Sequence, residues 1–374
     1  MLGTGSQSMS DMSILRGYHR LQQIAGLLAL TLLLGGCSQP AALADPFLPT
    51  GAGSQAVGSA AILQQCWSET ELSGPTQGIQ KPLPVDLDGP SPDAIQRAAM
   101  ALPPLPSYLR GSIRSVDLAQ SNSRPAGQKW VALTFDLCEQ ANERTGYQAD
   151  TINYLRQHRI PATFYAGGKW MKTHPQQAMQ LMADPLFEVG NHAWSHGNMR
   201  VLTGAAMRRQ ITWTQAQYAQ LRDELAARSC TRAAGSNEMA RIPRYPTTFR
   251  FPYGTCSQES LDALADYGLA AIQWTVVTGD PARGQSAAGI ARQVLNGVKS
   301  SSGSIVIAHA NGRGWNTAAA LPQFIPQLQA DGYRFVTVSD LLLAGQPVSA
   351  QSCYELRPGD NARYDRLFGE GTGE

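Results

Sequence analysis

The sequence predicts an α/β protein built around a largely parallel sheet. From Trp130 onward, short apolar runs of strand length alternate with stretches that carry apolar residues at helical spacing. Strands that alternate with helices in this way pair in parallel through right-handed crossovers. About seven such units fit the chain, either as a barrel related to the TIM fold or as an open doubly wound sheet.

Seven segments have the length and composition of strands. They are residues 131–136, 162–166, 187–191, 248–251, 269–274, 304–308 and 334–338. The stretches between them have helical ends. An apolar stripe runs through 207–225, a second helix is capped by Ser257 and stops at Gly268, and a third opens at Thr317 and stops at Gly332.

The first 37 residues have the pattern of a lipoprotein signal peptide. Basic residues Arg16 and Arg20 precede an apolar run over 24–34, which is too short to span a bilayer. The run ends in Leu-Gly-Gly-Cys37, which resembles a bacterial lipobox, where the cysteine is diacylated and becomes the mature N-terminus. With Ser38 next, we expect a lipid-anchored protein of the bacterial cell envelope, periplasmic or facing the outer membrane.

The rest of the chain divides by composition into three parts. Residues 38–128 are rich in Ala, Gly, Pro and Ser and are expected to form a low-order tether, with a short helix capped by Ser91. Residues 129–345 form the expected catalytic domain. Residues 346–374 are expected to be an irregular tail.

The charge and cysteine content limit the functional classes. With 30 basic and 28 acidic residues and no basic block, the chain is not expected to bind nucleic acid. The sequence does not indicate the oligomeric state. Beyond Cys37 there are five cysteines, and disulfides are permitted in an exported protein. An odd number leaves at least one free thiol.

Polar residues follow the expected strands at their carboxyl ends. Asp136, His192, Arg250, Asp280 and His309 each end or follow such a strand. In a βα barrel the active site lies at these ends of the strands. Any one of these residues alone is as well explained by a helix cap or a structural hydrogen bond. Together they supply the acid, base and ligand groups that hydrolysis requires.

The motifs around these residues resemble those of the NodB-like polysaccharide deacetylases (carbohydrate esterase family 4). They are Thr134-Phe135-Asp136, His192-Ala193-Trp194-Ser195-His196, Arg250-Phe251-Pro252-Tyr253-Gly254, Asp280 and Ile307-Ala308-His309, in the family's order. The resemblance covers about residues 129–343. It implies a distorted (β/α)7 barrel preceded by an irregular N-terminal extension. It also implies a hydrolase that removes N-linked acetyl groups from an N-acetylhexosamine polymer such as peptidoglycan, a chitin-like oligomer or an exopolysaccharide.

The resemblance also assigns roles to the site residues. His192 and His196 would be ligands of a divalent metal, with Zn²⁺ the expected ion, and their rings would share one face if the segment were helical. Asp136 would be the general base and His309 the acid that protonates the departing amine. In addition, Arg250 would orient Asp136, Asp280 would pair with His309, and the Tyr253 backbone N–H would help hold the oxyanion.

The first motif departs from the family, which usually has Asp-Asp where this chain has Asp136-Leu137. The second aspartate is the third metal ligand in relatives, and leucine cannot bind a metal. Glu139 and Asp136 are our preferred replacements. Cys138 can serve only as a free thiolate, which conflicts with the Cys138–Cys256 disulfide that the rim placement of the two motifs suggests. A glycan-binding protein with impaired catalysis and an ester or small-amide hydrolase are the alternative functions.

Overall fold

The structure is a computed structural model that describes residues 58–119 and 127–374. The helices of the described residues are α1 (Ala60–Cys66), α2 (Glu69–Ser73), α3 (Pro92–Ala99), α4 (Ala149–Gln157), α5 (Gly168–Thr173), α6 (Pro175–Ala183), α7 (Gly204–Ala227), α8 (Ser229–Ala234), α9 (Gln258–Asp266), α10 (Ala287–Gly297), α11 (Thr317–Ala330), α12 (Val338–Leu343) and α13 (Arg363–Phe368). The strands are β1 (Ser112–Asp117), β2 (Lys129–Leu137), β3 (Ala162–Ala166), β4 (Phe187–Asn191), β5 (Thr248–Phe249), β6 (Ala270–Ala271), β7 (Val276–Val277), β8 (Gly303–His309), β9 (Tyr333–Val336) and β10 (Gln346–Ala350).

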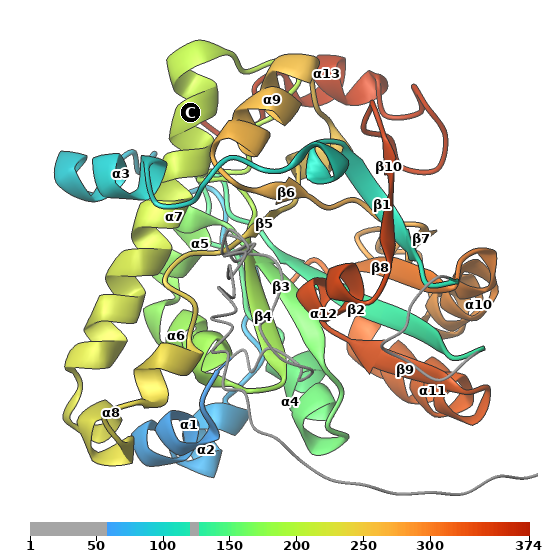
Figure 1. Cartoon of the computed structure of the whole chain (residues 1–374), viewed down its shortest axis with the longest axis horizontal. Helices are drawn as coiled ribbons and strands as arrows, with labels where there is room; N and C mark the ends of the chain where they lie inside the picture. The colour runs from blue at the N-terminus through green and yellow to red at the C-terminus, as the bar shows by residue number, and fades with distance from the viewer. Residues whose placement is uncertain (1–57, 120–126) are drawn as a thin grey trace, which may run out of the picture. The chain divides into compact units, whose positions relative to one another are not determined.

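Parallel strands in the order β7-β8-β2-β3-β4-β5-β6 form the sheet, and β9 adds to β2. Helices cover the outside of this sheet, with α10 and α11 beside β8 and with α5, α6 and α7 beside β4 (Figure 1). The expected distorted (β/α)7 barrel is confirmed, and all seven predicted strands are present. Strands β5 and β6 are shorter than predicted because their ends turn into the loops that carry the site.

Strand β1 fills the gap between the two ends of the parallel series. It pairs antiparallel with the first part of β8 through Ser115 and Val116, while β7 pairs with the later part of the same edge. At its other side Ile113 forms a bridge with Ile272, just beyond β6. The barrel is therefore distorted because an antiparallel strand stands between β6 and β8.

Strand β2 shows how the sheet separates its two faces. Leu133, Phe135 and Leu137 belong to the core cluster shared with the outer helices. Trp130 and Ala132 belong to the cluster inside the barrel. Because side chains alternate along a strand, Thr134 and Asp136 follow Trp130 and Ala132 on the inner face.

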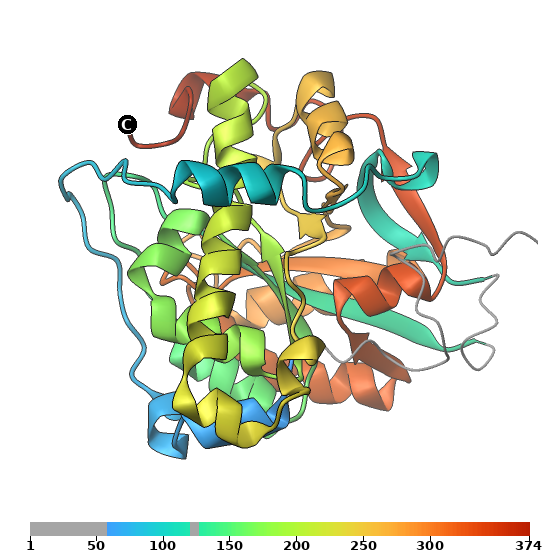
Figure 2. The same cartoon turned by 60° about the vertical axis from the view of Figure 1, so that its left-hand side comes forward.

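The segment before the barrel is more ordered than the composition predicted. Helices α1, α2 and α3 and strand β1 form within residues 58–119, so the tether prediction is wrong for that range. The Ser91 hydroxyl accepts from the Ala94 N–H, as predicted for the cap of α3. This helix lies across α7 (Figure 2). These elements are ordered because they pack against the barrel, and amino-acid composition alone does not reveal such packing.

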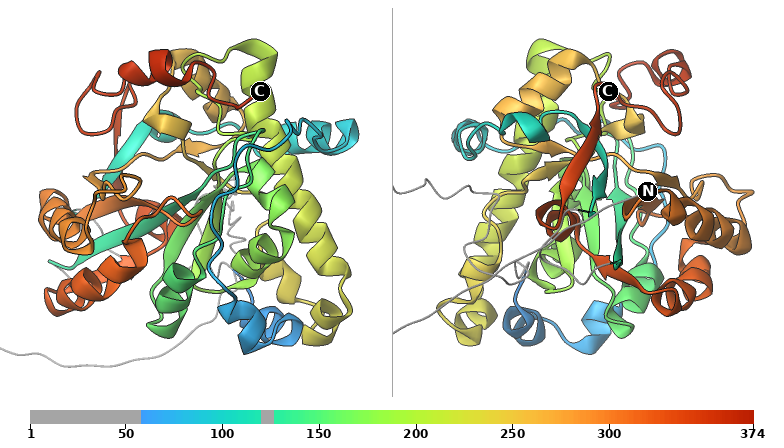
Figure 3. Two further views of the ribbon diagram at one scale, coloured as in Figure 1. Left: turned by 180° about the vertical axis from the view of Figure 1, so that it is seen from behind. Right: turned by 45° about the vertical axis from the view of Figure 1, so that its right-hand side comes forward.

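The segment after the barrel is also built into the fold. Strand β10 pairs antiparallel with β1, and the two lie side by side in Figure 3. Helix α13 follows. The tail predicted to be irregular therefore contains a strand and a helix. A proline at position 347 is compatible with this strand because β10 lies at the edge of the sheet.

The cysteines pair differently from the expectation. Cys66 bonds to Cys230 and Cys256 bonds to Cys353, which leaves Cys138 as a buried free thiol. The predicted Cys138–Cys256 disulfide is wrong. The long Arg250 side chain spans the gap between its own strand and Asp136, so their contact does not bring the following cysteines together. Cys256 instead packs in a separate core cluster with Cys353.

The expected lipid site at Cys37 lies outside the described residues. Within residues 58–119 and 127–374, no helix has both the length and the apolar character needed to cross a membrane.

Candidate active site

The carboxyl end of β2 brings Asp136 against Arg250. The guanidinium Nη1 lies 3.2 Å from Asp136 Oδ1 and donates to Thr134 Oγ1 at 2.6 Å. The same side chain donates to the carbonyls of Ile272 and Gln273. Arg250 is fully buried, so these contacts hold it rigidly and leave Asp136 Oδ2 free to face the cavity. The geometry fits the orienting role expected of this arginine.

His309 at the end of β8 is held by the buried carboxylate of Asp280. Oδ1 lies 2.9 Å from His309 Nδ1, and Oδ2 accepts from the His309 backbone N–H at 2.8 Å. The hydroxyls of Thr278 and Thr317 donate to the same carboxylate. Burial by itself lowers the pKa of His309, but the charge and hydrogen bond of Asp280 outweigh it, and the pKa is raised. His309 is thus favoured in its protonated, acidic form.

His192 and His196 lie in a loop rather than in the helix that their spacing suggested. Ala193 has φ +64° and His196 has φ +59°, in the left-handed region that non-glycine residues seldom adopt. These two turns fold the loop so that the imidazole rings are 5.1 Å apart. The pair comes together as predicted, but through a strained loop. Backbone strain of this kind is common at functional sites.

Both imidazoles have the protonation and the burial expected of residues that could hold a metal. His192 Nδ1 lies 2.8 Å from the Arg250 carbonyl, so Nδ1 carries the proton and Nε2 carries the lone pair. That Nε2 is buried and has no hydrogen-bond partner among the described residues. Burial lowers the pKa of His192 and holds that of His196 well below the usual value, which favours the neutral form of both rings. An unpartnered buried lone pair beside a second neutral imidazole fits a divalent metal.

The third donor near these rings is Cys138. Its Sγ and one nitrogen of each of His192 and His196 all lie within 4.8 Å of one another. Burial raises the pKa of this thiol to about 11. Asp136 Oδ2 is 3.6 Å from His192 Nε2 but is not a member of this group.

Glu139, one of our two candidates for the third donor, points away from the histidines. Its carboxylate accepts from the Thr145 backbone N–H at 2.8 Å and from the Thr173 hydroxyl at 3.0 Å, with Lys169 Nζ at 3.5 Å. Glu139 is completely buried in this network against α5. The expectation that it completes the metal site is therefore wrong, and its role is to fix the chain after β2.

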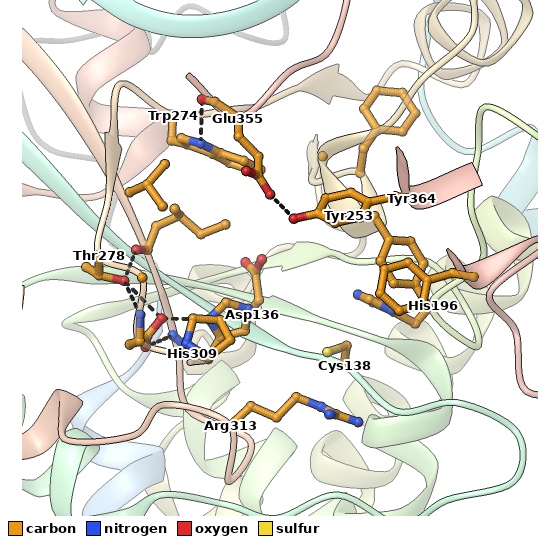
Figure 4. A pocket seen from close by; sticks show the side chains of 18 of the residues that line it. Asp136, Cys138, His196, Tyr253, Trp274, Thr278, His309, Arg313, Glu355 and Tyr364 are labelled. Atoms are coloured by element: carbon orange, nitrogen blue, oxygen red, sulfur yellow. Dashed lines mark hydrogen bonds and ion pairs between the residues drawn. The ribbon is translucent and has the colours of Figure 1, made fainter. Parts of the chain in front are cut away.

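Asp136, Cys138, His196, Asp280 and His309 line one cavity of about 510 Å³. Figure 4 shows Asp136, Cys138, His196 and His309 around the same space. Charged residues lie at its mouth, where Glu143 Oε2 is 2.7 Å from both Lys81 Nζ and Arg313 Nη2. Two cations share one carboxylate there, so this part of the cavity carries a net positive charge.

Tyr253 forms a wall of the cavity together with residues from the C-terminal segment. Its φ of +59° turns the loop after β5, and its hydroxyl donates to the Gly371 carbonyl at 3.0 Å. Phe368 stacks on its ring at a centroid distance of 4.6 Å, and Tyr364 lies beside Phe368 at 5.4 Å. A Cβ on Gly371 would lie 2.6 Å from the Tyr253 ring, so only glycine allows this approach.

Sequence reasoning missed several residues of the cavity. Lys81 comes from the segment before the barrel, and Glu355, Tyr364 and Phe368 come from the segment after it. No motif marks any of them, and tertiary folding alone brings them to the rim. Cys138 is different, because strand alternation places it on the same face as Asp136.

Comparisons with known proteins agree with the motifs. The sequence profile of the polysaccharide deacetylase family matches residues 123–272. A peptidoglycan-N-acetylglucosamine deacetylase of Listeria monocytogenes is 26% identical over 280 residues, which are 74% of this chain and 51% of that protein. A chitooligosaccharide deacetylase of Bradyrhizobium sp. is 29% identical over 221 residues, covering 56% of this chain and 88% of that protein.

One solved structure, of a peptidoglycan N-acetylglucosamine deacetylase, aligns with a TM-score of 0.49 at 25% identity, over 63% of this chain and 94% of the other. The chain spans about half the length of the Listeria relative that it matches. The profile match runs from before β2 to β6 and includes the motifs of Asp136, His192, His196 and Arg250. These motifs therefore lie within a segment, residues 123–272, that matches the polysaccharide deacetylase family.

Proposed function

We propose that this protein is a hydrolase that removes N-linked acetyl groups from an N-acetylhexosamine polymer. The observation that carries the proposal is the placement of two differently prepared proton-transfer groups around one cavity. Asp136 is held by Arg250, and His309 is held by Asp280. A protein that only bound glycans would need neither arrangement. Peptidoglycan and chitin oligomers are the substrates that the names of the relatives support.

The proton path follows from the geometry. Asp136 Oδ2 takes a proton from water as the water oxygen bonds to the acetyl carbonyl carbon. When the carbon–nitrogen bond breaks, the departing amine takes a proton from His309 Nε2, since Nδ1 is occupied by Asp280. The products are acetate and a free amino sugar. The Tyr253 backbone N–H, in the turn beside the cavity, is proposed as an oxyanion donor.

A divalent metal would be held by His192 and His196 together with a third donor from this chain. When bound, such an ion polarises the acetyl carbonyl and lowers the pKa of water. Arg250 contributes twice to this arrangement, because its side chain fixes Asp136 while its carbonyl fixes the tautomer of His192. Leu137 had favoured a non-catalytic glycan-binding protein. That argument weakens because Cys138 stands beside the histidines instead.

The aromatic wall formed by Tyr253, Tyr364 and Phe368 is proposed as the surface that receives a sugar ring. Tyr364 is partly exposed and Phe368 is 45% exposed, so both rings have faces that remain open. Aromatic faces bind the apolar faces of other rings through well-defined stacking. This wall would position the polymer while the acetyl group enters between Asp136 and His309.

The test is acetate release from a panel of peptidoglycan, chitin oligomers, acetylated exopolysaccharide and a small acetyl ester, each with and without chelator. We expect release from at least one N-acetylated polymer, and loss of release with chelator. Activity confined to the ester would favour the ester hydrolase alternative. Binding of oligomers without acetate release would favour the glycan-binding alternative.

The cell envelope is the proposed location, in agreement with relatives named for peptidoglycan. The Leu-Gly-Gly-Cys37 junction supports lipid attachment at Cys37. We predict that Cys37→Ser leaves an uncleaved or soluble protein, measured by the mature mass and by membrane partitioning. Unchanged mass and unchanged partitioning in this variant would contradict the anchor.

A further inference from the structure

We propose that Cys138 is a metal ligand and that the site is a thiolate–bis-imidazole site, which prefers thiophilic ions such as Zn²⁺ and Co²⁺. This inference deepens the proposed function by assigning the third donor and the class of metal. It rests on three features of Cys138: the direction of its side chain, its hydrogen-bond partners, and the unpartnered nitrogen of His192 beside it.

The direction follows from the alternation along β2. Leu133, Phe135 and Leu137 pack in the outer core, so Thr134, Asp136 and Cys138 turn to the inside of the barrel. The substitution at Leu137 therefore does not remove a donor from the cavity. The donor has moved one residue along the chain, where the next inward-facing side chain is a sulfur.

The donors are suitably placed. Cys138 Sγ and the nitrogens of His192 and His196 lie within 4.8 Å of one another. Zn–N and Zn–S bonds of about 2.0–2.3 Å in a tetrahedral site place donor atoms about 3.5 Å apart. Small side-chain movements are sufficient to close that difference. Among the described residues, the buried His192 Nε2 has no hydrogen-bond partner, and its lone pair requires one, which gives independent evidence for a ligand at this point.

The neighbours of Cys138 resemble the outer support of a metal ligand. Asn311, which is completely buried, donates from Nδ2 to Cys138 Sγ at 3.1 Å and to the Cys138 carbonyl at 2.7 Å. The Thr145 hydroxyl donates to the same carbonyl at 2.9 Å. An N–H directed at sulfur stabilises a thiolate, and hydrogen bonds of this kind orient metal ligands.

The assignment also resolves a conflict in the chemistry. If Asp136 were the third ligand, the proposed base would be lost. A sulfur ligand leaves Asp136 to Arg250. A carboxylate is a hard oxygen ligand and suits ions such as Mg²⁺ and Mn²⁺. A thiolate together with imidazole is a softer ligand set and selects Zn²⁺ over Mg²⁺ or Mn²⁺. When the ion binds, the metal–sulfur bond forms and the thiol proton is released to solvent.

The experiment loads the full chain with Co²⁺ and records its absorption spectrum. We expect one ion per chain and an intense near-ultraviolet band from thiolate-to-cobalt charge transfer. Among the described residues Cys138 is the only free cysteine, because the other four form disulfides. Cys37→Ser is the matched control and must keep the band. Cys138→Ser must lose it and weaken Zn²⁺ binding by at least about 100-fold.

Cys138→Asp provides the second variant, since it restores a carboxylate to the site. It should bind metal without the charge-transfer band and should shift the preference from Zn²⁺ towards Mn²⁺. Circular dichroism reports whether each variant is folded, and the wild-type spectrum needs no variant at all. A wild-type cobalt complex without the band, or a band that survives in Cys138→Ser, overturns the inference.

Acetate release is measured on the same samples, which separates the two proposals. Acetate release without the band rejects the sulfur ligand and keeps the deacetylase. The band without acetate release from any N-acetylated polymer keeps the sulfur ligand and rejects the deacetylase.

Discussion

Replacing Asp280 by Asn is expected to impair the acid step while keeping the shape of the site. Asp280 is completely buried and accepts from His309 twice, from Thr278 and from Thr317, at 2.7–2.9 Å. An amide keeps one acceptor oxygen and turns an NH₂ group towards donors. His309 then loses the negative charge that opposes its burial, and its pKa falls.

The size of the effect follows from the role of His309. Positioned acid catalysis contributes about 10²–10⁴-fold, which corresponds to about 3–5 kcal/mol of transition-state free energy. We expect Asp280→Asn to lose a large part of this. The direction in which the pH profile of kcat/KM shifts also follows from this role. Because the acid must be protonated, a lower His309 pKa moves the alkaline limb of the kcat/KM profile to lower pH.

The assay is kcat/KM for acetate release as a function of pH, with Thr317→Val as the matched control. That control removes one neutral hydrogen-bond donor to Asp280 but keeps the negative charge of its carboxylate. It should lower the free energy of unfolding by about 0.5–1.5 kcal/mol. Its alkaline limb should stay near that of the wild type. An Asp280→Asn enzyme with wild-type rate and an unmoved alkaline limb would refute the assignment of His309 as the acid.

Four further outcomes are expected. Asp136→Asn should abolish acetate release in a protein that remains folded by circular dichroism, because an amide cannot accept the proton of water; wild-type turnover would exclude Asp136 as the base. His309→Ala should lose about 10²–10⁴-fold in kcat; an unchanged kcat would exclude His309 as the acid. Cys353→Ser should lower the free energy of unfolding by about 2–5 kcal/mol in a denaturant titration; an unchanged midpoint would show that the disulfide does not hold the C-terminal segment. Tyr364→Ala should raise KM for oligomers by about 2–10-fold, the value of one aromatic contact, and leave a small acetyl ester unaffected; equal effects on both would contradict a sugar-binding wall.

The sequence predicted secondary structure best where a strand is specified by its own local residues. Segments 162–166 and 187–191 form β3 and β4 with the predicted bounds, and both are short, largely buried segments of strand length. Strand β7 is two residues long and presents no period to detect. Strand β1 lies in a region whose composition resembles a linker, and its order comes from β8 and β10.

The site was predicted in its members but not in its local geometry. Asp136, Arg250, Asp280 and His309 pair as the motifs imply. The histidine loop is not helical, because Ala193 and His196 have positive φ values. The sequence did not predict these φ values, because they depend on contacts with the surrounding structure. Glu139 was expected at the metal because it is near in sequence, yet alternation along β2 makes its neighbour Cys138 the inward residue. Counting that alternation beyond the end of the strand would have identified it.

The aromatic wall has a consequence for how the cavity is assembled. The residues that line the cavity extend along the chain from Lys81 to Phe368, and the Gly371 carbonyl accepts a hydrogen bond from the Tyr253 hydroxyl of the wall. A chain emerging from the ribosome can pair β2, β3 and β4 long before α13 exists. The reaction space is therefore completed last, after the barrel has formed and Cys353 has reached Cys256. A chain cut after β10 would keep every strand of the sheet and lack one side of its cavity.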